Sequence, residues 1–247
     1  MLWFSLILTA LPFSVNEVPL NPRCIGALVI GPEQEAPTTV ALSDCNQNHE
    51  QVEVERGQPT WSDPQTREFT RYEVIGRLPN GDWALHWVWG GGGSGNFSGL
   101  GVFRLTKTAL IRVRIVTEGD RCNGGVRAAS IAGSKLKFTA SVTPVDLVRA
   151  SAFGKTLSPE IDGLLESSAG SCVAVFELTE EKLTGATLDP ALEDTTGWTE
   201  RFRLQHCYNT LHTEIAAKTP HLDGAGLERF ARQFKDRCLG QGQDGGR

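Results

Sequence analysis

Six cysteines are spread along this chain of 247 residues and limit its fold more than any other feature. They are Cys24, Cys45, Cys122, Cys172, Cys207 and Cys238. None belongs to a Cys-x-x-Cys pair, so the spacing gives little support to a zinc ribbon or a thioredoxin-type site. An even set in an exported chain favours disulfides, and six cysteines allow about 15 pairings. We predict three local bridges: 24–45, 122–172 and 207–238.

The chain begins with an apolar run from Leu2 to Phe13, interrupted by two hydroxyl residues. A run of about 12 residues is too short to cross a membrane and is typical of the core of a signal peptide. We predict a signal peptide over residues 1–14, with cleavage after Ala10 or Ser14, and export to the periplasm or the medium. The alternatives are a buried N-terminal strand and a wrongly assigned start codon. The mature chain is expected to contain no integral membrane span.

The middle of the chain alternates apolar and polar residues with the period of half-buried strands. The clearest case is 71–78, followed by Pro79-Asn80-Gly81-Asp82 and a second strand over 83–89. Asn-Gly suits the two positive-φ positions of a type I′ turn, so we predict a hairpin with this turn. Further strands are expected over residues 52–55, 100–105, 111–115, 135–140 and 172–178.

Helices are expected in the last part of the chain. Thr143, followed by Pro144 and Asp146, has the pattern of a helix N-cap and predicts a short helix over 144–152. Beyond it, apolar residues recur every three or four positions over 204–215 and again over 227–238.

The two C-terminal helices are separated by a stop signal and a new cap. Thr219-Pro220 ends the first helix, and Asp223 is placed to cap the second. An antiparallel helical hairpin would bring its open ends together and place Cys207 near Cys238. This geometry is the physical argument for the third bridge.

These patterns predict an α+β fold, with an antiparallel β-rich body, a short helix, a C-terminal helical hairpin and disulfide staples. We expect a single domain over residues 15–247. Its β-rich part spans 24–142, its mixed and helical part spans 143–239, and a loose tail follows over 240–247.

Charge is segregated along the chain. The net charge is −5 and the isoelectric point about 5.6, which argues against nucleic-acid binding. Residues 104–149 nevertheless carry nine basic and three acidic groups. Four of these cations alternate along two expected strands: Arg112, Arg114, Lys135 and Lys137. On a shared sheet face they would either attract an anionic partner or pair across strands with Glu53 and Glu55, and the pairing is the favoured interpretation.

Two glycine-rich segments are the candidate binding elements. The stretch 90–96 formally fits G-x-G-x-x-G, but a strand and not a helix is expected after it, which argues against a dinucleotide site. We interpret it as a wide hairpin loop, with ligand binding by its amides as the alternative. The stretch 119–125 is interpreted as a disulfide-anchored turn. If the two segments are adjacent, they form a pocket whose candidate binding residues are Gly93, Ser94, Asn96, Asp120, Arg121 and Asn123.

Together, the segments Gly-Gly-Gly-Ser-Gly and Gly-Asp-Arg-Cys-Asn-Gly-Gly resemble features of uncharacterised exported bacterial proteins. The resemblance covers only these two short segments. It implies no activity and carries over no functional residue.

Aromatic and histidine residues give two further expectations. Trp83, Leu85, Trp87 and Trp89 share one face of a strand, which we assign to the core, with a glycan-stacking platform as the alternative. The five histidines show no metal-binding spacing, so neither a metal site nor a cofactor is expected.

No recognisable catalytic set is present, and the sequence therefore favours a non-enzymatic function. We expect an exported protein that binds an envelope protein or a glycan. The alternative is a cell-envelope hydrolase with a site near Ser94, Asp120 and Arg121.

Overall fold

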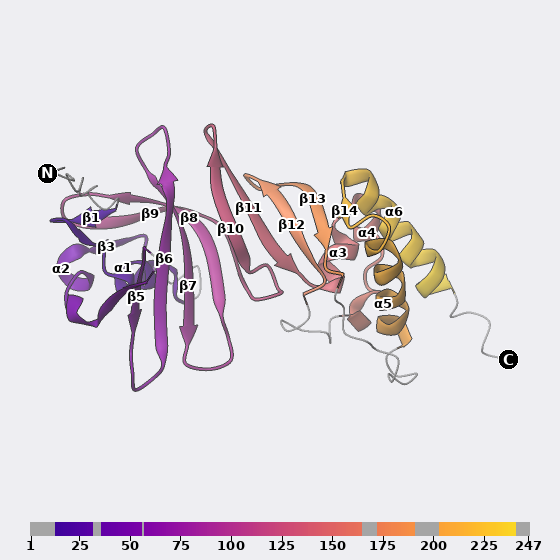
Figure 1. The fold of residues 1–247 in the computed structure, drawn as a ribbon, viewed down its shortest axis with the longest axis horizontal. Helices are drawn as coiled ribbons and strands as arrows, with labels where there is room; N and C mark the ends of the chain where they lie inside the picture. The colour runs from indigo at the N-terminus through magenta and orange to yellow at the C-terminus, as the bar shows by residue number, and fades with distance from the viewer. Residues whose placement is uncertain (1–12, 32–35, 56, 165–171, 191–202, 241–247) are drawn as a thin grey trace, which may run out of the picture. The chain divides into compact units, whose positions relative to one another are not determined.

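The computed structural model describes residues 13–31, 36–55, 57–164, 172–190 and 203–240. The chain divides into two compact units, Met1–Val116 and Thr117–Arg247 (Figure 1). Each unit has its own hydrophobic core. The domain expected over 15–247 thus contains two separately packed units, and their boundary falls inside the section expected to be β-rich. Most of the expected signal peptide and nearly all of the expected tail lie outside the described residues.

The first unit is built on a seven-stranded antiparallel sheet in the order β3-β9-β8-β7-β6-β5-β4. Its strands are β3 (Thr39–Ala41), β4 (Val52–Glu55), β5 (Gln58–Ser62), β6 (Glu68–Arg77), β7 (Trp83–Gly91), β8 (Phe97–Leu105) and β9 (Ala109–Asp120). The smaller elements are the paired strands β1 (Ser14–Val15) and β2 (Val18–Pro19), the helices α1 (Pro22–Val29) and α2 (Leu42–Cys45), and the 3₁₀ turn η1 (His49–Gln51).

The predicted hairpin is present as β6 and β7, but its turn is not type I′. The Gly81 amide donates to the Leu78 carbonyl at 2.9 Å, which makes Pro79 and Asn80 the central residues of the turn. Gly81 has a φ of 88°, whereas Asn80 is absent from the residues with positive φ. Proline fixes φ near −65° and favours the first central position of an ordinary turn, and Gly81 then supplies the left-handed residue that follows it.

The row of tryptophans on β7 is part of the core, as predicted. Leu85 and Trp87 are 0% and 1% exposed, and Trp83 and Trp89 pack against the same cluster. The Trp87 ring meets Phe103 of β8 edge to face, with ring centroids 5.8 Å apart. The glycan-stacking alternative is therefore wrong for this row.

Helix α1 was not expected within the β-rich section. Asn21 caps it by accepting a hydrogen bond from the Arg23 amide at 3.0 Å, and Pro22 occupies its first turn. The helix buries Ile25 and Leu28 in the core of the first unit. The Cys24–Cys45 disulfide joins α1 to α2 and so holds this helix in place.

Phe13 is the first described residue and already belongs to the core. It is 2% exposed, and its ring meets Tyr72 and Trp83 edge to face at centroid distances of 5.7 and 5.8 Å. Cleavage after Ser14 would remove this ring from the folded protein, whereas cleavage after Ala10 would retain it. The core of the first unit therefore begins before the end of the expected signal peptide.

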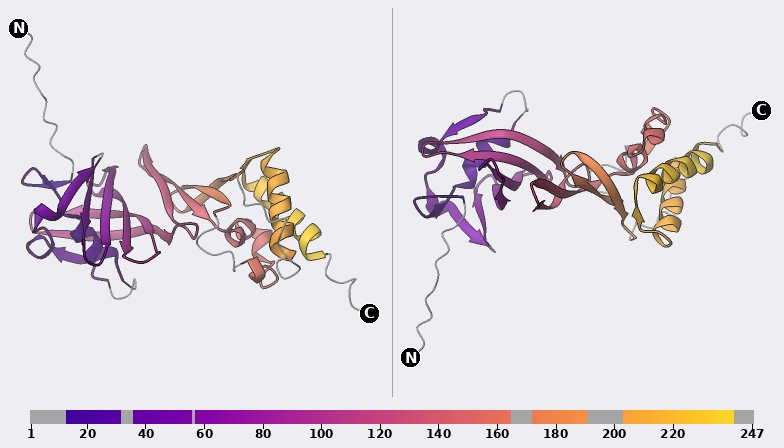
Figure 2. Two further views of the ribbon diagram at one scale, coloured as in Figure 1. Left: turned by 60° about the horizontal axis from the view of Figure 1, so that its bottom comes forward. Right: turned by 90° about the horizontal axis from the view of Figure 1, so that it is seen from above.

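The second unit contains a five-stranded antiparallel sheet in the order β10-β11-β12-β13-β14. Its strands are β10 (Val126–Ala132), β11 (Lys135–Val142), β12 (Ala174–Thr179), β13 (Lys182–Leu188) and β14 (His221–Leu222). Its helices are α3 (Pro144–Arg149), α4 (Ala152–Lys155), α5 (Arg203–Ala216) and α6 (Gly224–Phe234), with the 3₁₀ turn η2 (Asp162–Leu164) and the π-helical turn η4 (Lys235–Leu239). Figure 2 shows the α5–α6 hairpin beside the last strands of this sheet.

One face of the five-stranded sheet packs on the helices. Alternate residues of β11, β12 and β13, such as Val142, Ala174 and Leu188, join Leu211 and Phe230 of the helical hairpin in one buried cluster. The intervening residues of β11 and β13, such as Lys137 and Thr187, are exposed. The sheet therefore has one apolar and one polar face, as the alternation predicts.

The predicted helix signals are confirmed. Thr143 and Asp146 form a reciprocal capping box at the start of α3, and the Asp223 carboxylate accepts the Gly226 amide at 2.7 Å at the start of α6. All three predicted disulfides are present, and they join Cys24 to Cys45, Cys122 to Cys172 and Cys207 to Cys238. None of the helices in the described ranges is long and apolar enough to cross a bilayer.

We predict that Phe13→Ala lowers the free energy of unfolding by about 3–5 kcal/mol, because it empties an aromatic site in the core. Urea denaturation of a chain that includes residue 13 measures this loss. Val18→Ala serves as the control, because Val18 is 43% exposed and its truncation should cost less than about 0.5 kcal/mol. Equal stabilities for the two variants would contradict the placement of Phe13.

Candidate functional site

The glycine-rich segment 90–96 is a hairpin loop in the first unit. Strand β7 ends at Gly91 and β8 begins at Phe97. Gly92 has a φ of 77°, and a Cβ there would collide with the Thr66 carbonyl oxygen. Close packing of the loop against the turn before β6 thus explains this glycine. Gly93, Ser94 and Asn96 are exposed.

The segment 119–125 is a tight turn in the second unit. Asp120 and Asn123 exchange backbone hydrogen bonds of 3.1 and 2.8 Å, while Cys122 is buried and bonded to Cys172. The Arg121 guanidinium lies 3.2 Å from the Asp120 carboxylate. A Cβ at Gly119 would collide with the Asn123 carbonyl. The segment has the geometry of the disulfide-anchored turn that we predict.

The two glycine-rich segments belong to different units. Each has a local packing reason for its glycines. A shared pocket formed by the six candidate binding residues stays a prediction.

The four basic residues expected on one face do not share a sheet. Arg112 and Arg114 lie on β9 of the seven-stranded sheet, and Lys135 and Lys137 lie on β11 of the five-stranded sheet. The expected pairing with Glu53 and Glu55 is also wrong, because four strands separate β9 from β4. Sequence alternation identified the strands but contained no information on their order.

Arg112 instead forms hydrogen bonds with two backbone segments of the first unit. Its guanidinium donates to the Leu28 carbonyl at 2.9 Å and to the Ala36 carbonyl at 3.1 Å. Its charge thus satisfies backbone acceptors near the end of α1 and before β3. This side chain links α1 to the chain just before β3, and its guanidinium is already hydrogen-bonded to backbone carbonyl groups.

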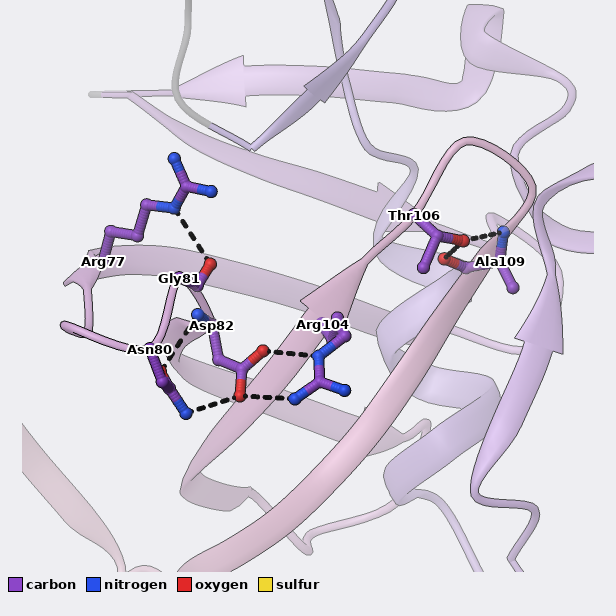
Figure 3. A network of polar contacts seen from close by, with 7 residues as sticks. All are labelled: Arg77, Asn80, Gly81, Asp82, Arg104, Thr106 and Ala109. Atoms are coloured by element: carbon purple, nitrogen blue, oxygen red, sulfur yellow. Dashed lines mark hydrogen bonds and ion pairs between the residues drawn. The ribbon is translucent and has the colours of Figure 1, made fainter.

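A buried carboxylate that the sequence analysis missed lies at the β6–β7 turn (Figure 3). The Asp82 side chain is 1% exposed and accepts two hydrogen bonds from Arg104, at 2.8 and 3.1 Å. Asn80 donates to the same carboxylate at 2.8 Å. These bonds, first of all that from Arg104, hold the pKa of Asp82 below its ordinary value despite its burial.

The Asp82–Arg104 pair fixes the turn against β8 and has the character of a structural contact. Figure 3 also shows the Arg77 Nε atom donating to the Gly81 carbonyl at 2.9 Å, and Thr106 closing the β8–β9 turn through Ala109. Asp82 and Arg104 are 22 positions apart, so sequence spacing gives no signal for the pair.

Helix α5 buries a polar stripe in the core of the second unit. Gln205, Tyr208 and His212 are 6%, 0% and 0% exposed. The His212 Nε2 atom donates to the Val173 carbonyl at 2.7 Å, whereas within the described part of the chain its Nδ1 atom and the Tyr208 hydroxyl have no hydrogen-bond partner. Burial lowers the pKa of His212, outweighing the Val173 hydrogen bond and the Asp189 charge, which favour the protonated ring.

The polar face of the five-stranded sheet carries a shallow groove. It has a volume of about 390 Å³ and is lined by residues of β10 to β13, among them Ser130, Lys137, Thr139 and Glu177. The Glu177 carboxylate accepts a hydrogen bond from Thr187 at 3.0 Å and lies 3.3 Å from the His221 ring. The groove is thus lined by charged groups of both signs, Lys137 and Glu177.

The groove is bounded by β10, the outer strand of this sheet. Ala128, Ser130 and Ala132 are exposed, and Ala128–Ala132 pairs in continuous register with Thr139–Lys135 of β11. The other edge of β10 has no strand beside it among the residues that the structure describes. Its backbone N–H and C=O groups can therefore pair with a further strand.

Metal binding finds no support within the described residues, where no three His, Cys, Asp or Glu side chains gather as a metal site would require. Comparison with family models, with curated proteins and with solved structures found no match.

We predict that protonation of His212 destabilises the protein. Its pKa is lower in the folded state than the unfolded value of about 6.5, so the unfolded chain binds the proton more tightly. The stability from the neutral ring is fully present above the unfolded pKa of about 6.5 and is lost as the pH falls from there through the lower pKa of the folded state.

Urea denaturation at pH values between about 7.5 and 5.5 tests the titration of His212. His212→Gln should flatten the loss of stability on acidification, because glutamine takes up no proton in this pH range. Parallel pH profiles for wild type and His212→Gln would show that another group is responsible.

Proposed function

We propose that this protein is an exported, disulfide-stabilised binding protein without catalytic activity. We further propose that it recognises an extended segment of an envelope protein by adding that segment as a strand along β10. The mode is β-augmentation, in which main-chain hydrogen bonds supply affinity and neighbouring side chains supply specificity. The observation that carries the proposal is that β10, a strand of seven residues, is the outer strand of its sheet within the described residues.

The other outer strands of the two larger sheets are short. Strand β3 has three residues, β4 has four and includes two glutamates, and β14 has two. Strand β10 has seven. Short or charged edge strands are the usual protection against unwanted pairing, and β10 is the longest of these four outer strands.

The single charged side chain of β10 is that of Arg127, and it is hydrogen-bonded to the neighbouring strand β11. The Arg127 Nε atom donates to the Ser141 hydroxyl of β11 at 2.6 Å. Arg127 also lies at a β-bulge, which leaves the uncharged segment 128–132 as the regular part of the strand. A partner strand along this segment would meet no charge on β10, and Ile131 is the one large side chain there.

A polypeptide partner is favoured because an added strand pairs through main-chain N–H and C=O groups, which every polypeptide supplies. A glycan remains the alternative partner. No observation favours the hydrolase alternative: the Asp120 carboxylate pairs with the Arg121 guanidinium at 3.2 Å.

We predict that linear peptides selected from a displayed library bind wild type, and that Ala128→Lys combined with Ser130→Lys weakens binding at least about tenfold, a loss of about 1.4 kcal/mol. Two lysines on the edge oppose the approach of an added strand. Titration calorimetry measures the affinity, and amide hydrogen exchange should show protection of residues 128–132.

The control for this experiment combines Thr213→Lys with Ala217→Lys, which adds the same charge at exposed positions on and just beyond α5. It should bind like wild type. Protection away from β10, or equal loss in both double variants, would overturn the proposal. Self-association of wild type through β10, seen on a sizing column, would make the partner a second copy, and specific binding of a glycan without β10 protection would favour that alternative.

We predict that the exported chain starts after Ala10 and so retains Phe13, since the core of the first unit includes this ring. Intact-mass measurement of protein recovered from outside the cytoplasm determines the N-terminus. An N-terminus beyond Phe13 would contradict this cleavage site, and recovery of the uncleaved chain in the cytoplasm alone would contradict export.

A further inference from the structure

A separate cavity lies in the C-terminal helical hairpin, away from the β10 edge. Its volume is about 240 Å³. It is bounded by the C-terminal half of α5, by the chain between α5 and α6, and by one side of α6. The residues that determine its chemistry are Glu214, Lys218, Leu222, Arg229, Phe230 and Gln233.

Two cations line this cavity without an acceptor. Lys218 lies just beyond the end of α5 and Arg229 lies on α6, and both side chains are exposed. Neither makes an ion pair or a side-chain hydrogen bond within the described ranges. By contrast, four other arginines, Arg104, Arg149, Arg232 and Arg237, are each paired with a carboxylate. Lys218 acts on Glu214 through its charge alone, and Arg229 has no carboxylate against it within those ranges, so the cavity has an excess of positive charge.

The acid that lines the cavity is already neutralised. Both oxygens of Glu214 accept hydrogen bonds from Arg237, at 2.7 and 3.1 Å. The Asp223 carboxylate is likewise occupied, because it caps the amide of Gly226. Both carboxylates thus have hydrogen-bond partners other than Lys218 and Arg229, and these two cations outnumber the one acid in the lining, so the cavity keeps its positive character.

The inner wall of the cavity is apolar. Leu222 and Phe230 are 4% and 1% exposed, and Ile215 is half-buried beside them. The Cys207–Cys238 disulfide and the Glu214–Arg237 pair both join the two arms of the hairpin, so the wall is held by covalent and ionic links. A fixed apolar wall with charged groups at its rim is the usual arrangement of a small-molecule site.

We propose that this cavity binds a small organic oxyanion, with its carboxylate or phosphate between Lys218 and Arg229 and its apolar body against Leu222 and Phe230. The planar guanidinium of Arg229 can donate two parallel hydrogen bonds to either oxyanion, and the ammonium of Lys218 adds a point charge. The small volume limits the ligand to a single ring or a short chain. This site is independent of the proposed β10 edge.

The test titrates three probes into isotopically labelled protein: benzoate, phenyl phosphate and inorganic phosphate. Benzoate or phenyl phosphate should shift the amide resonances of residues 214–233 in a saturable manner and bind at least about fivefold more tightly than inorganic phosphate, because the ring contributes apolar contact. The tighter of the two aromatic probes identifies the oxyanion.

Lys218→Gln and Arg229→Gln should each weaken this binding about tenfold, since each removes a charged donor. Lys182→Gln is the matched control, because Lys182 is an exposed cation elsewhere in the same unit. Arg229→Lys keeps the charge but loses the paired donors, and should bind with intermediate affinity.

Three results would overturn the proposal: shifts that do not saturate or lie outside 214–233, equal affinity for inorganic phosphate and the aromatic probes, or binding by Arg229→Gln that matches wild type. Dispersed amide spectra of each variant, recorded first, separate loss of binding from loss of fold.

Discussion

Both units of this protein depend on the packing of an antiparallel sheet in a hydrophobic core, and in the first unit the middle of β8 is buried on both faces. In the first unit, Leu85 and Trp87 at the centre of the sheet pack with α1 and with Phe13, which comes from the beginning of the chain. In the second unit, alternate residues of the sheet pack on α3, α5 and α6. Each buried face provides most of the hydrophobic stabilisation of its unit, and every other feature is arranged around it.

An open sheet that buries a face must also end at two edges. Most edges of this protein are short strands, which limits the number of unpaired backbone groups that they offer. Strand β10 differs because it is long, its regular part carries no charge, and its arginine bonds to the neighbouring strand. The binding function proposed for this protein follows from that difference.

Polar contacts and disulfides fasten the parts that the two cores do not reach. Asp82 and Arg104 hold a turn, Arg112 satisfies carbonyl groups near α1, and Glu214 with Arg237 joins the arms of the hairpin. The disulfides connect α1 to α2, the 120–123 turn to the chain before β12, and α5 to the end of the hairpin. Because Arg237 occupies both oxygens of Glu214, this acid of the cavity does not pair with Arg229.

Prediction from the sequence succeeded where the signal is local. The hairpin strands of β6 and β7, the caps of α3 and α6, and the placement of Trp87 in the core were all predictable from a few adjacent residues. The Cys207–Cys238 bridge was predictable because an antiparallel pair of helices fixes which ends meet. Helix α1 was missed although Asn21-Pro22 is an N-cap signal, because the surrounding section reads as strands.

The sequence by itself determined the strand and helix periodicities, the capping residues and the even set of cysteines, since each depends on residues within one element or one hairpin. Tertiary structure alone decided the order of the strands, and with it the separation of Arg112 from Lys137, the pairing of Asp82 with Arg104, and the position of β10 at an edge. Strand order is set by packing and hydrogen bonding between segments far apart in the chain, and no local pattern records it.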